Sequence, residues 1–289
     1  MITGIVDVGG GLRGIYAAGI LDYCMVHKIQ FDCCIGVSAG SANMAAYLAG
    51  QQGRNYIYYQ EYSFRREYMG TRNLIQSGSY IDLNYVYGTL SNADGEYPLD
   101  YYALSHNPAK LFVVATQAET GQACYFTKED MHPDDFRILM ASCCVPGVNR
   151  PYEWNGVKYY DGALSDPVPI EKAFAEGCDR VVLILTKPVT VPRKQGKDRL
   201  LASLIQWDYP IAAQQLRMRA ERYNRAVQMA KEYEAAGRMM ILSPDDITGV
   251  DTLKRNRPAL QRLYYKGLQD GKRVLGWISQ HENKGCEIG

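Results

Sequence analysis

A serine between two glycines is the clearest sign of chemistry in this sequence. Ser38 stands in Gly36-Val37-Ser38-Ala39-Gly40, a G-x-S-x-G pattern that follows the mostly apolar run 31–35. We expect a short strand, a tight turn at Ser38 and a helix over Ala39–Leu48. A nucleophile at such a corner has strained backbone torsions, and the two glycines avoid side-chain clashes there. The first helical amides would favour a developing negative charge; a plain turn of small residues is the alternative.

A second glycine-rich turn, Gly9-Gly10-Gly11-Leu12-Arg13-Gly14, follows a predicted first strand over Gly4–Val8 and precedes a predicted helix over Ile15–Val26. Its glycines let the backbone approach a ligand and turn N–H groups outward, which suits an oxyanion or a phosphate. A flexible turn is the alternative. If the two strands are parallel neighbours, both turns lie at the same edge of the sheet.

The same turn contains the G-x-G-x-x-G spacing of dinucleotide-binding folds. Those folds place an acidic residue near the end of the second strand, where it binds the ribose hydroxyls. Here Asp32 stands at the beginning of the second predicted strand, and the strand ends in Gly36-Val37-Ser38. The sequence therefore favours a site shared by the glycine turn and Ser38.

Asp161 is a third candidate. Asn155-Gly156 lies between alternating apolar and polar residues, which is typical of a β-hairpin. The second hairpin strand is expected to end at Tyr160-Asp161-Gly162-Ala163. Because a glycine follows and gives access, the Asp161 carboxylate fits a site better than a solvated surface.

Strands and helices alternate along most of the chain, which predicts an α/β fold: a three-layer sandwich with a mainly parallel central sheet and a helical C-terminal part. We expect one domain over 1–289, with a core over 1–190 and the helical part 191–289 packed on it. The tyrosine-rich insertion 51–102 either covers an apolar substrate groove or packs its tyrosines on the core. Further strands are predicted at 110–116, 123–126, 180–186 and 239–243, and further helices at 134–140, 170–176, 216–231 and 253–278.

Composition excludes several classes of protein. The chain has 289 residues and 47% hydrophobic content, enough for a substantial core. Its 32 basic and 31 acidic side chains are nearly balanced, so no global charge indicates a nucleic-acid partner. No leader-like segment and no apolar run long enough for a membrane span stand out, and we expect a cytoplasmic protein.

The eight cysteines include the adjacent pairs Cys33-Cys34 and Cys143-Cys144, which lack the C-x-x-C spacing of zinc sites. We interpret them as reduced core residues and expect no metal site. Four basic residues precede the predicted C-terminal helix: Arg193, Lys194, Lys197 and Arg199. They are interpreted either as a solvated helix face or as a peripheral contact with an anionic membrane.

Together and in this order, the turns 9–14 and 36–40 and the segment Asp161-Gly162-Ala163 resemble the patatin-like phospholipase family. The resemblance extends through Ala141-Ser142 with Pro146 and through 164–170, and is firm over 1–190. In length and in its helical C-terminal third, the chain is most similar to bacterial cytoplasmic members. Two departures occur: Ala163 replaces the second glycine of Asp-Gly-Gly, and Val8 stands where an acidic residue often precedes the glycines.

The resemblance implies a serine lipid acyl hydrolase of the phospholipase A, lysophospholipase or esterase type, with a lipid or ester substrate and no metal or cofactor. Ser38 would be the nucleophile and Asp161 its base, forming a Ser–Asp dyad. The family's motifs then match the following positions: Gly9, Gly10, Gly11, Arg13 and Gly14 in the oxyanion hole; Gly36, Val37, Ala39 and Gly40 in the nucleophile elbow; and Gly162 and Ala163 in the acid motif.

Two other functions remain open at this point. An α/β-hydrolase with a histidine base needs the chain order serine, acid, histidine. Only His281 follows Asp161, and Ser38 comes after one strand rather than several; His27, His106 and His132 are expected on the surface. A catalytically silent lipid-binding protein is the other alternative, which the presence of both Ser38 and Asp161 disfavours.

Overall fold

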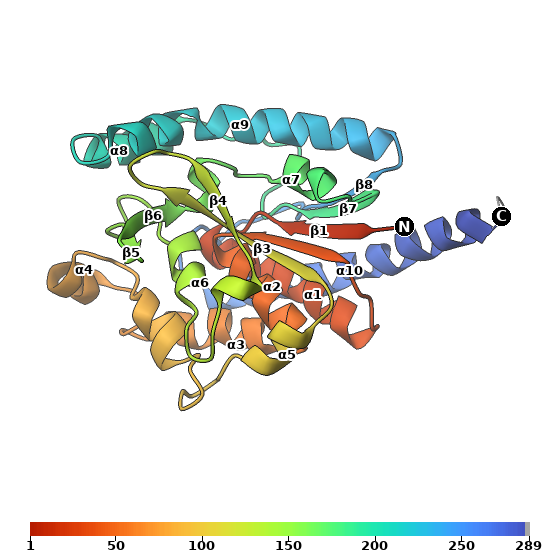
Figure 1. Ribbon diagram of the computed structural model, residues 1–289, viewed down its shortest axis with the longest axis horizontal. Coiled ribbons are helices and arrows are strands. Elements are labelled where there is room, and N and C mark those ends of the chain that lie inside the picture. Colours follow the sequence, from red (N-terminus) through yellow and green to blue (C-terminus); the bar gives the residue numbers. More distant parts are fainter. Residues whose placement is uncertain (287–289) are drawn as a thin grey trace.

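A mixed sheet of eight strands forms the middle layer of the molecule (Figure 1). The computed structural model describes the backbone of residues 1–286 and the side chains of residues 1–279. The strand order is β5-β6-β3-β2-β1-β7-β8, and β4 pairs with β3. Strands β3, β2, β1, β7 and β8 are parallel, whereas β4, β5 and β6 pair in antiparallel fashion. The strands are β1 (Thr3–Asp7), β2 (Cys33–Val37), β3 (Lys110–Gln117), β4 (Ala123–Phe126), β5 (Tyr152–Trp154), β6 (Val157–Asp161), β7 (Arg180–Ile184) and β8 (Met239–Leu242).

Helices cover both faces of the sheet, so the predicted three-layer α/β fold is confirmed (Figure 1). Alternate residues of β1 point to opposite faces because side chains alternate along a strand. Ile5 packs in the core with α1 (Ile15–Val26) and α2 (Ala39–Leu48). Val6 packs in the second core with α7 (Ile170–Ala175) and α9 (Pro210–Ala235).

The C-terminal part is helical, as expected, and includes a helix that the sequence analysis did not separate. This helix, α8 (Gly196–Ile205), contains Lys197 and Arg199, which were expected ahead of the helix. The last helix, α10 (Arg257–Cys286), packs along α1, where Gly267 and Gly19 allow close approach. A Cβ on Gly267 would lie 2.1 Å from the carbonyl oxygen of Tyr16.

The insertion 51–102 contains helices and turns, with α3 (Arg54–Gln60), α4 (Thr71–Ser77) and the start of α5 (Tyr101–His106). Its only described strand-like feature is the isolated bridge between Met69 and Ile81. Several of its tyrosines are buried in the same core as α1 and α2: Tyr58, Tyr59, Tyr62 and Tyr87. These four side chains therefore pack on the core, as one of the two interpretations of the insertion expects.

Several predicted elements differ from the observed ones in their bounds. The helix expected over 134–140 is α6 (Arg137–Ser142), because a bridge between His132 and Asp135 occupies the residues before it. The strands expected to end at 186 and 243 end at Ile184 and Leu242. The hairpin is confirmed, with Asn155 (φ 52°) and Gly156 (φ 74°) both left-handed, as its tight turn requires.

Candidate active site

The register of the sheet brings Ser38 and Asp161 together. On one edge of β3, β2 ends with Val37 opposite Val114, and β6 ends with Asp161 opposite Ala115, the next residue. Because β2 runs parallel to β3 and β6 runs antiparallel to it, the two strands meet end to end. Ser38, which follows Val37, therefore lies at the end of β6. A Cβ on Gly162 would lie 2.2 Å from the carbonyl oxygen of Val114, so only glycine permits this close meeting.

Ser38 occupies a strained turn. Its φ is +57°, a left-handed conformation that is rare for a residue with a side chain and costs on the order of 1–3 kcal/mol. A Cβ on Gly36 would lie 2.3 Å from Ser41 Cα, and one on Gly40 would lie 2.4 Å from the carbonyl oxygen of Asp7. The two glycines of the motif are thus required by backbone contacts, and the turn presents a serine that is 7% exposed.

Ser142 supports this turn. The Ser38 amide donates a hydrogen bond to Ser142 Oγ (2.9 Å), and the Ser142 hydroxyl donates to the carbonyl oxygen of Val114 (2.6 Å). From the sequence, Ser142 was placed only within the extent of the family resemblance. Its role depends on the position of α6 over β3, which no local pattern indicates.

Asp161 is 2% exposed and hydrogen-bonded. Its Oδ1 accepts the amide of Ala163 (2.8 Å). Burial raises the pKa of Asp161 above its usual value, and hydrogen bonds from the Ser38 side chain and the Ala163 amide, with the charges of Arg219 and Arg193, oppose part of this rise. The carboxyl group therefore has the partial desolvation and the contact with Ser38 that a base for a hydroxyl group needs.

The glycine turn lies against the Ser38 turn. Gly9, Gly10 and Gly11 all have positive φ (63°, 124° and 60°), and a Cβ on Gly9 would lie 2.1 Å from the carbonyl oxygen of Val37. The Gly9 amide donates to Asp7 Oδ1 (2.9 Å), and its carbonyl accepts the hydroxyl of Thr186. The Gly9 amide is therefore already bonded, contrary to the expectation that it is an oxyanion donor. Within the part of the chain that the structure describes, the amides of Gly10 and Gly11 have no assigned acceptor.

A buried polar network holds this turn in place. Asp7 Oδ2 accepts Asn43 Nδ2 (2.8 Å), which also donates to the carbonyl oxygen of Gly14 (3.0 Å), and Tyr59 donates to Asn43 Oδ1 (3.1 Å). Burial raises the pKa of Asp7 to about 6, although the hydrogen bonds from Asn43 and the Gly9 amide oppose this rise. Asp7 was not among the residues expected from the sequence, and it provides a carboxylate one residue before Val8.

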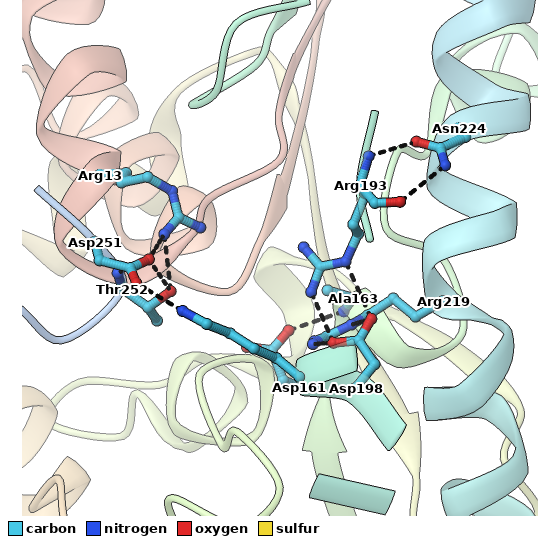
Figure 2. A network of polar contacts seen from close by, with 10 residues as sticks. Arg13, Asp161, Ala163, Arg193, Asp198, Arg219, Asn224, Asp251 and Thr252 are labelled. Atoms are coloured by element: carbon cyan, nitrogen blue, oxygen red, sulfur yellow. Dashed lines mark hydrogen bonds and ion pairs between the residues drawn. The ribbon is translucent and has the colours of Figure 1, made fainter. Parts of the chain in front are cut away.

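Arg13 connects the glycine turn to the C-terminal part (Figure 2). Its Nη1 donates to Asp251 Oδ1 (2.8 Å) and to Thr252 Oγ1 (2.8 Å), and the Leu12 amide donates to the carbonyl oxygen of Thr252 (3.0 Å). Burial lowers the pKa of the Arg13 guanidinium. Figure 2 also shows Arg193 and Arg219 paired with Asp198 near Asp161.

Two cavities of different character reach Ser38. The smaller, about 70 Å³, has a mainly apolar wall made by the insertion and the core. The larger, about 540 Å³, is lined by the glycine turn, Asp161 and charged side chains of the C-terminal part. Apolar side chains of the smaller cavity include Leu12, Ala42, Tyr58, Tyr59, Tyr68, Met69, Ile81, Leu83, Val86 and Tyr87. Ser38 therefore lies between an apolar and a charged space.

Other candidate residues lie elsewhere. The three histidines with described side chains, His27, His106 and His132, are exposed and line neither cavity. His281 lies outside the residues whose side chains are described. Asp32 accepts the amide of Thr3 (2.7 Å) at the far end of β2 from the glycine turn, so it cannot serve a dinucleotide there.

Two further features are absent from the described residues. They hold no group of three histidine, cysteine or acidic side chains arranged around a common metal position. None of their helices combines the length and apolarity that crossing a bilayer requires. The seven cysteines with described side chains form no disulfide with one another, and six of them are buried as expected, whereas Cys124 is half-buried.

Comparison with known proteins adds a family relationship. A family model for patatin-like phospholipase matches residues 8–174, which include the glycine turn, Ser38 and Asp161, and a model for a domain of unknown function (DUF6363) matches residues 209–281. The uncharacterised protein YjjU of Escherichia coli (strain K12) is 28% identical over 197 residues, 64% of this chain and 52% of YjjU, so the match spans about half of that relative. The crystal structure of VipD from Legionella pneumophila is similar with a TM-score of 0.48 and 13% identity, over 95% of this chain and 67% of VipD.

Proposed function

Because the chain belongs to the patatin-like phospholipase family, we propose that it is a serine lipid acyl hydrolase in which Ser38 and Asp161 act as a dyad. The family supports lipid hydrolysis in general terms. The observation that carries the finer proposal is the end-to-end meeting of β2 and β6, which brings the buried Ser38 next to the end of β6, where the Ser38 side chain opposes the rise in the pKa of Asp161.

The proposed reaction has two steps. Ser38 Oγ attacks the acyl carbonyl carbon while Asp161 accepts the hydroxyl proton, and the alcohol leaves with that proton. Water then attacks the acyl-enzyme and gives a proton to Asp161, which passes it to Ser38 Oγ as the bond to the acyl group breaks and the fatty acid is released. In both steps the carbonyl oxygen becomes negatively charged, and the amides of Gly10 and Gly11 are the donors that would stabilise it.

The two cavities suit the two halves of such an ester. The smaller cavity has an apolar wall, and its volume of about 70 Å³ is room for about five water molecules, which matches a short stretch of acyl chain. The larger cavity is charged and suits the alcohol half of the substrate. This division supports an ester that joins an apolar acyl group to a polar alcohol.

Contact with a membrane surface is part of this proposal. Next to the larger cavity, α8 and the residues after it carry exposed apolar side chains, namely Leu200 (67% exposed), Leu204 (61%) and Trp207 (89%). Large exposed apolar groups in a row are typical of surfaces that bind lipid or protein. The unpaired cysteines fit a reducing compartment, and we propose that the protein meets membranes from the cytoplasm.

A fluorophosphonate probe and p-nitrophenyl butyrate test the proposal. The wild type should be labelled at Ser38 and should hydrolyse the ester. Ser38→Ala should abolish both responses, and Asp161→Asn should lower turnover about as far, because the two residues act as one unit. The variants His27→Gln, His106→Gln and His132→Gln serve as controls and should stay within a few-fold of the wild type.

Two results would reject the dyad. A wild type without labelling or turnover would favour the silent lipid-binding protein. If His281→Gln proves as damaging as Ser38→Ala in a variant that still melts cooperatively, the histidine-based hydrolase takes its place.

A further inference from the structure

The larger cavity beside Ser38 has an excess of positive charge. Six cationic side chains and three carboxylates line it. Most of the cations follow residue 174, where the match to the family model ends. The cations are Arg13, Lys187, Arg193, Lys197, Arg219 and Lys254, and the carboxylates are Asp161, Asp198 and Asp251.

Two of the carboxylates are already shared among four of these cations. Asp198 accepts hydrogen bonds from Arg193 (3.0 Å) and from Arg219. Asp251 pairs with Arg13 (2.8 Å) and Lys197 (2.9 Å). The third carboxylate, Asp161, is in contact with Ser38. None of the three is therefore left to neutralise a further cation.

Two cations of the cavity are left over, Lys187 and Lys254. Lys254 is exposed to solvent, whereas Lys187 is half-buried. Lys187 lies just beyond the end of β7, next to Thr186, whose hydroxyl donates to the carbonyl oxygen of Gly9. Because β7 is the parallel neighbour of β1, Lys187 reaches the same edge of the sheet as the glycine turn. Its side chain is half-buried, and its ammonium group has no carboxylate partner among the side chains of residues 1–279.

The surroundings of Lys187 disfavour its charge. Burial, followed by the positive charges of Arg13, Arg193 and Lys197, lowers the pKa of Lys187 to about 8, while Asp251 opposes this shift. Nearby, Arg13 Nε is buried without an acceptor among the described residues. A half-buried cation without a counterion is unfavourable, and a bound anion would relieve it.

Resting on the proposed function, we propose that Lys187, with Arg13 and Arg193, forms an anion subsite for the alcohol half of the substrate. The preferred substrate is then an acyl ester whose alcohol carries a phosphate and a net negative charge. A zwitterionic head group would bring its own cation into a cavity that already has an excess of positive charge, and a neutral alcohol would leave Lys187 without a counterion. Lys187 is in this sense a specificity-determining residue.

The kinetic test compares two short-chain lipids, dihexanoylphosphatidylglycerol and dihexanoylphosphatidylcholine, below the concentrations at which they form micelles. Under these conditions no membrane charge contributes. The wild type should hydrolyse the anionic lipid with the higher kcat/KM, and Lys187→Gln should lower the ratio of the two kcat/KM values by about tenfold, the scale of one charge-assisted hydrogen bond. Lys231→Gln removes an exposed lysine of α9 outside this cavity and should leave the ratio unchanged.

A binding test does not depend on turnover. By calorimetry, sn-glycerol 3-phosphate should bind to Ser38→Ala and bind at least about tenfold more weakly to Ser38→Ala with Lys187→Gln. Inorganic phosphate is measured beside it. Phosphate binding that depends on Lys187, together with a kcat/KM ratio that does not, would make this a site for free phosphate and overturn the substrate assignment.

The two proposals fail in different ways. Ester hydrolysis with an unchanged ratio and no binding of glycerol 3-phosphate overturns the anion subsite and leaves the hydrolase standing. Binding that depends on Lys187 in a protein that hydrolyses no ester overturns the hydrolase and supports the anion subsite.

Discussion

The carboxyl group of Asp161 sets the conditions under which this site can act. In the proposed dyad only the ionised form would accept a proton from Ser38, and burial makes that form harder to reach than in an exposed aspartate. The Ser38 side chain and the Ala163 amide favour the ionised form and so oppose part of the rise in the pKa of Asp161. The same desolvation that raises the pKa of Asp161 makes its carboxylate a stronger base towards a hydroxyl group.

The pH profile of kcat/KM follows from this shift. The pKa of Asp161 is raised, so activity should fall as the pH decreases through a value above the ordinary aspartate value of about 4. No loss of activity should follow the titration of a histidine near pH 6.5. Assays of p-nitrophenyl butyrate hydrolysis across the acid range measure this.

The controls for the pH profile are His27→Gln, His106→Gln and His132→Gln, which should leave the acid limb in place. A limb that disappears in one of these variants would assign the base to that histidine instead of Asp161.

Helix α8 is the element through which the C-terminal part influences the candidate site. One side of this helix supplies Asp198, which holds Arg193 and Arg219 close to Asp161. Another side carries the exposed apolar residues Leu200 and Leu204. The basic residues before α9 therefore do not form one solvated or membrane-facing group, because Arg193 turns inward to the cavity.

Vesicle binding tests the apolar surface of α8. Trp207→Ser should weaken binding to phosphatidylglycerol vesicles by about tenfold or more, because burying a large apolar side chain contributes about 1.5–3 kcal/mol. Hydrolysis of a monomeric ester should stay unchanged, since Trp207 lines neither cavity. Sedimentation of the protein with vesicles is the measurement.

Val26→Ser is the matched control, because Val26 is an exposed apolar residue at the end of α1 (54% exposed). Equal losses in both variants, or none with Trp207→Ser, would argue against α8 as the lipid-binding surface.

For the whole molecule, the packing of α10 on α1 joins the last part of the chain to the first. Hydrogen bonds from Tyr16 to Asp270 (2.6 Å) and from Tyr264 to Asp22 (2.6 Å) connect the two helices. The glycines between them allow backbone contact. We propose on this ground that the chain folds as one cooperative domain rather than as a core with a separate C-terminal unit.

A pair of glycine variants on α10 tests this proposal. In Gly267→Ala the new Cβ meets the carbonyl oxygen of Tyr16 at 2.1 Å, and a Cβ on Gly276 meets nothing within 4 Å. Gly267→Ala should destabilise the protein by on the order of 1–3 kcal/mol, whereas Gly276→Ala should stabilise it by up to about 1 kcal/mol through helix propensity.

Calorimetry should show a single transition that moves as a whole in both variants. If two transitions are seen and only one of them moves with Gly267→Ala, the C-terminal part is a separate domain.

Local sequence patterns were enough to predict many of the strands and helices of this protein. The apolar runs of β1, β2 and β7, the Asn155-Gly156 hairpin and the helices α1 and α2 were predicted within a few residues, because each depends on neighbours in the chain. The G-x-S-x-G spacing, the glycine turn and Asp161-Gly162-Ala163 together were sufficient to indicate the family, since backbone strain at each turn permits few residue types.

Only the tertiary structure decided which groups meet. Asp161 reaches Ser38 because β6 joins β3 where β2 ends, and that register is set by contacts between distant segments. The same holds for the Gly9 amide, which bonds to Asp7, and for Lys187 and Arg193, which turn into the cavity. A sequence pattern reports the periodicity of one element. The direction in which a charged side chain points and the acceptor of a backbone amide depend on how several elements pack. No local pattern contains that information.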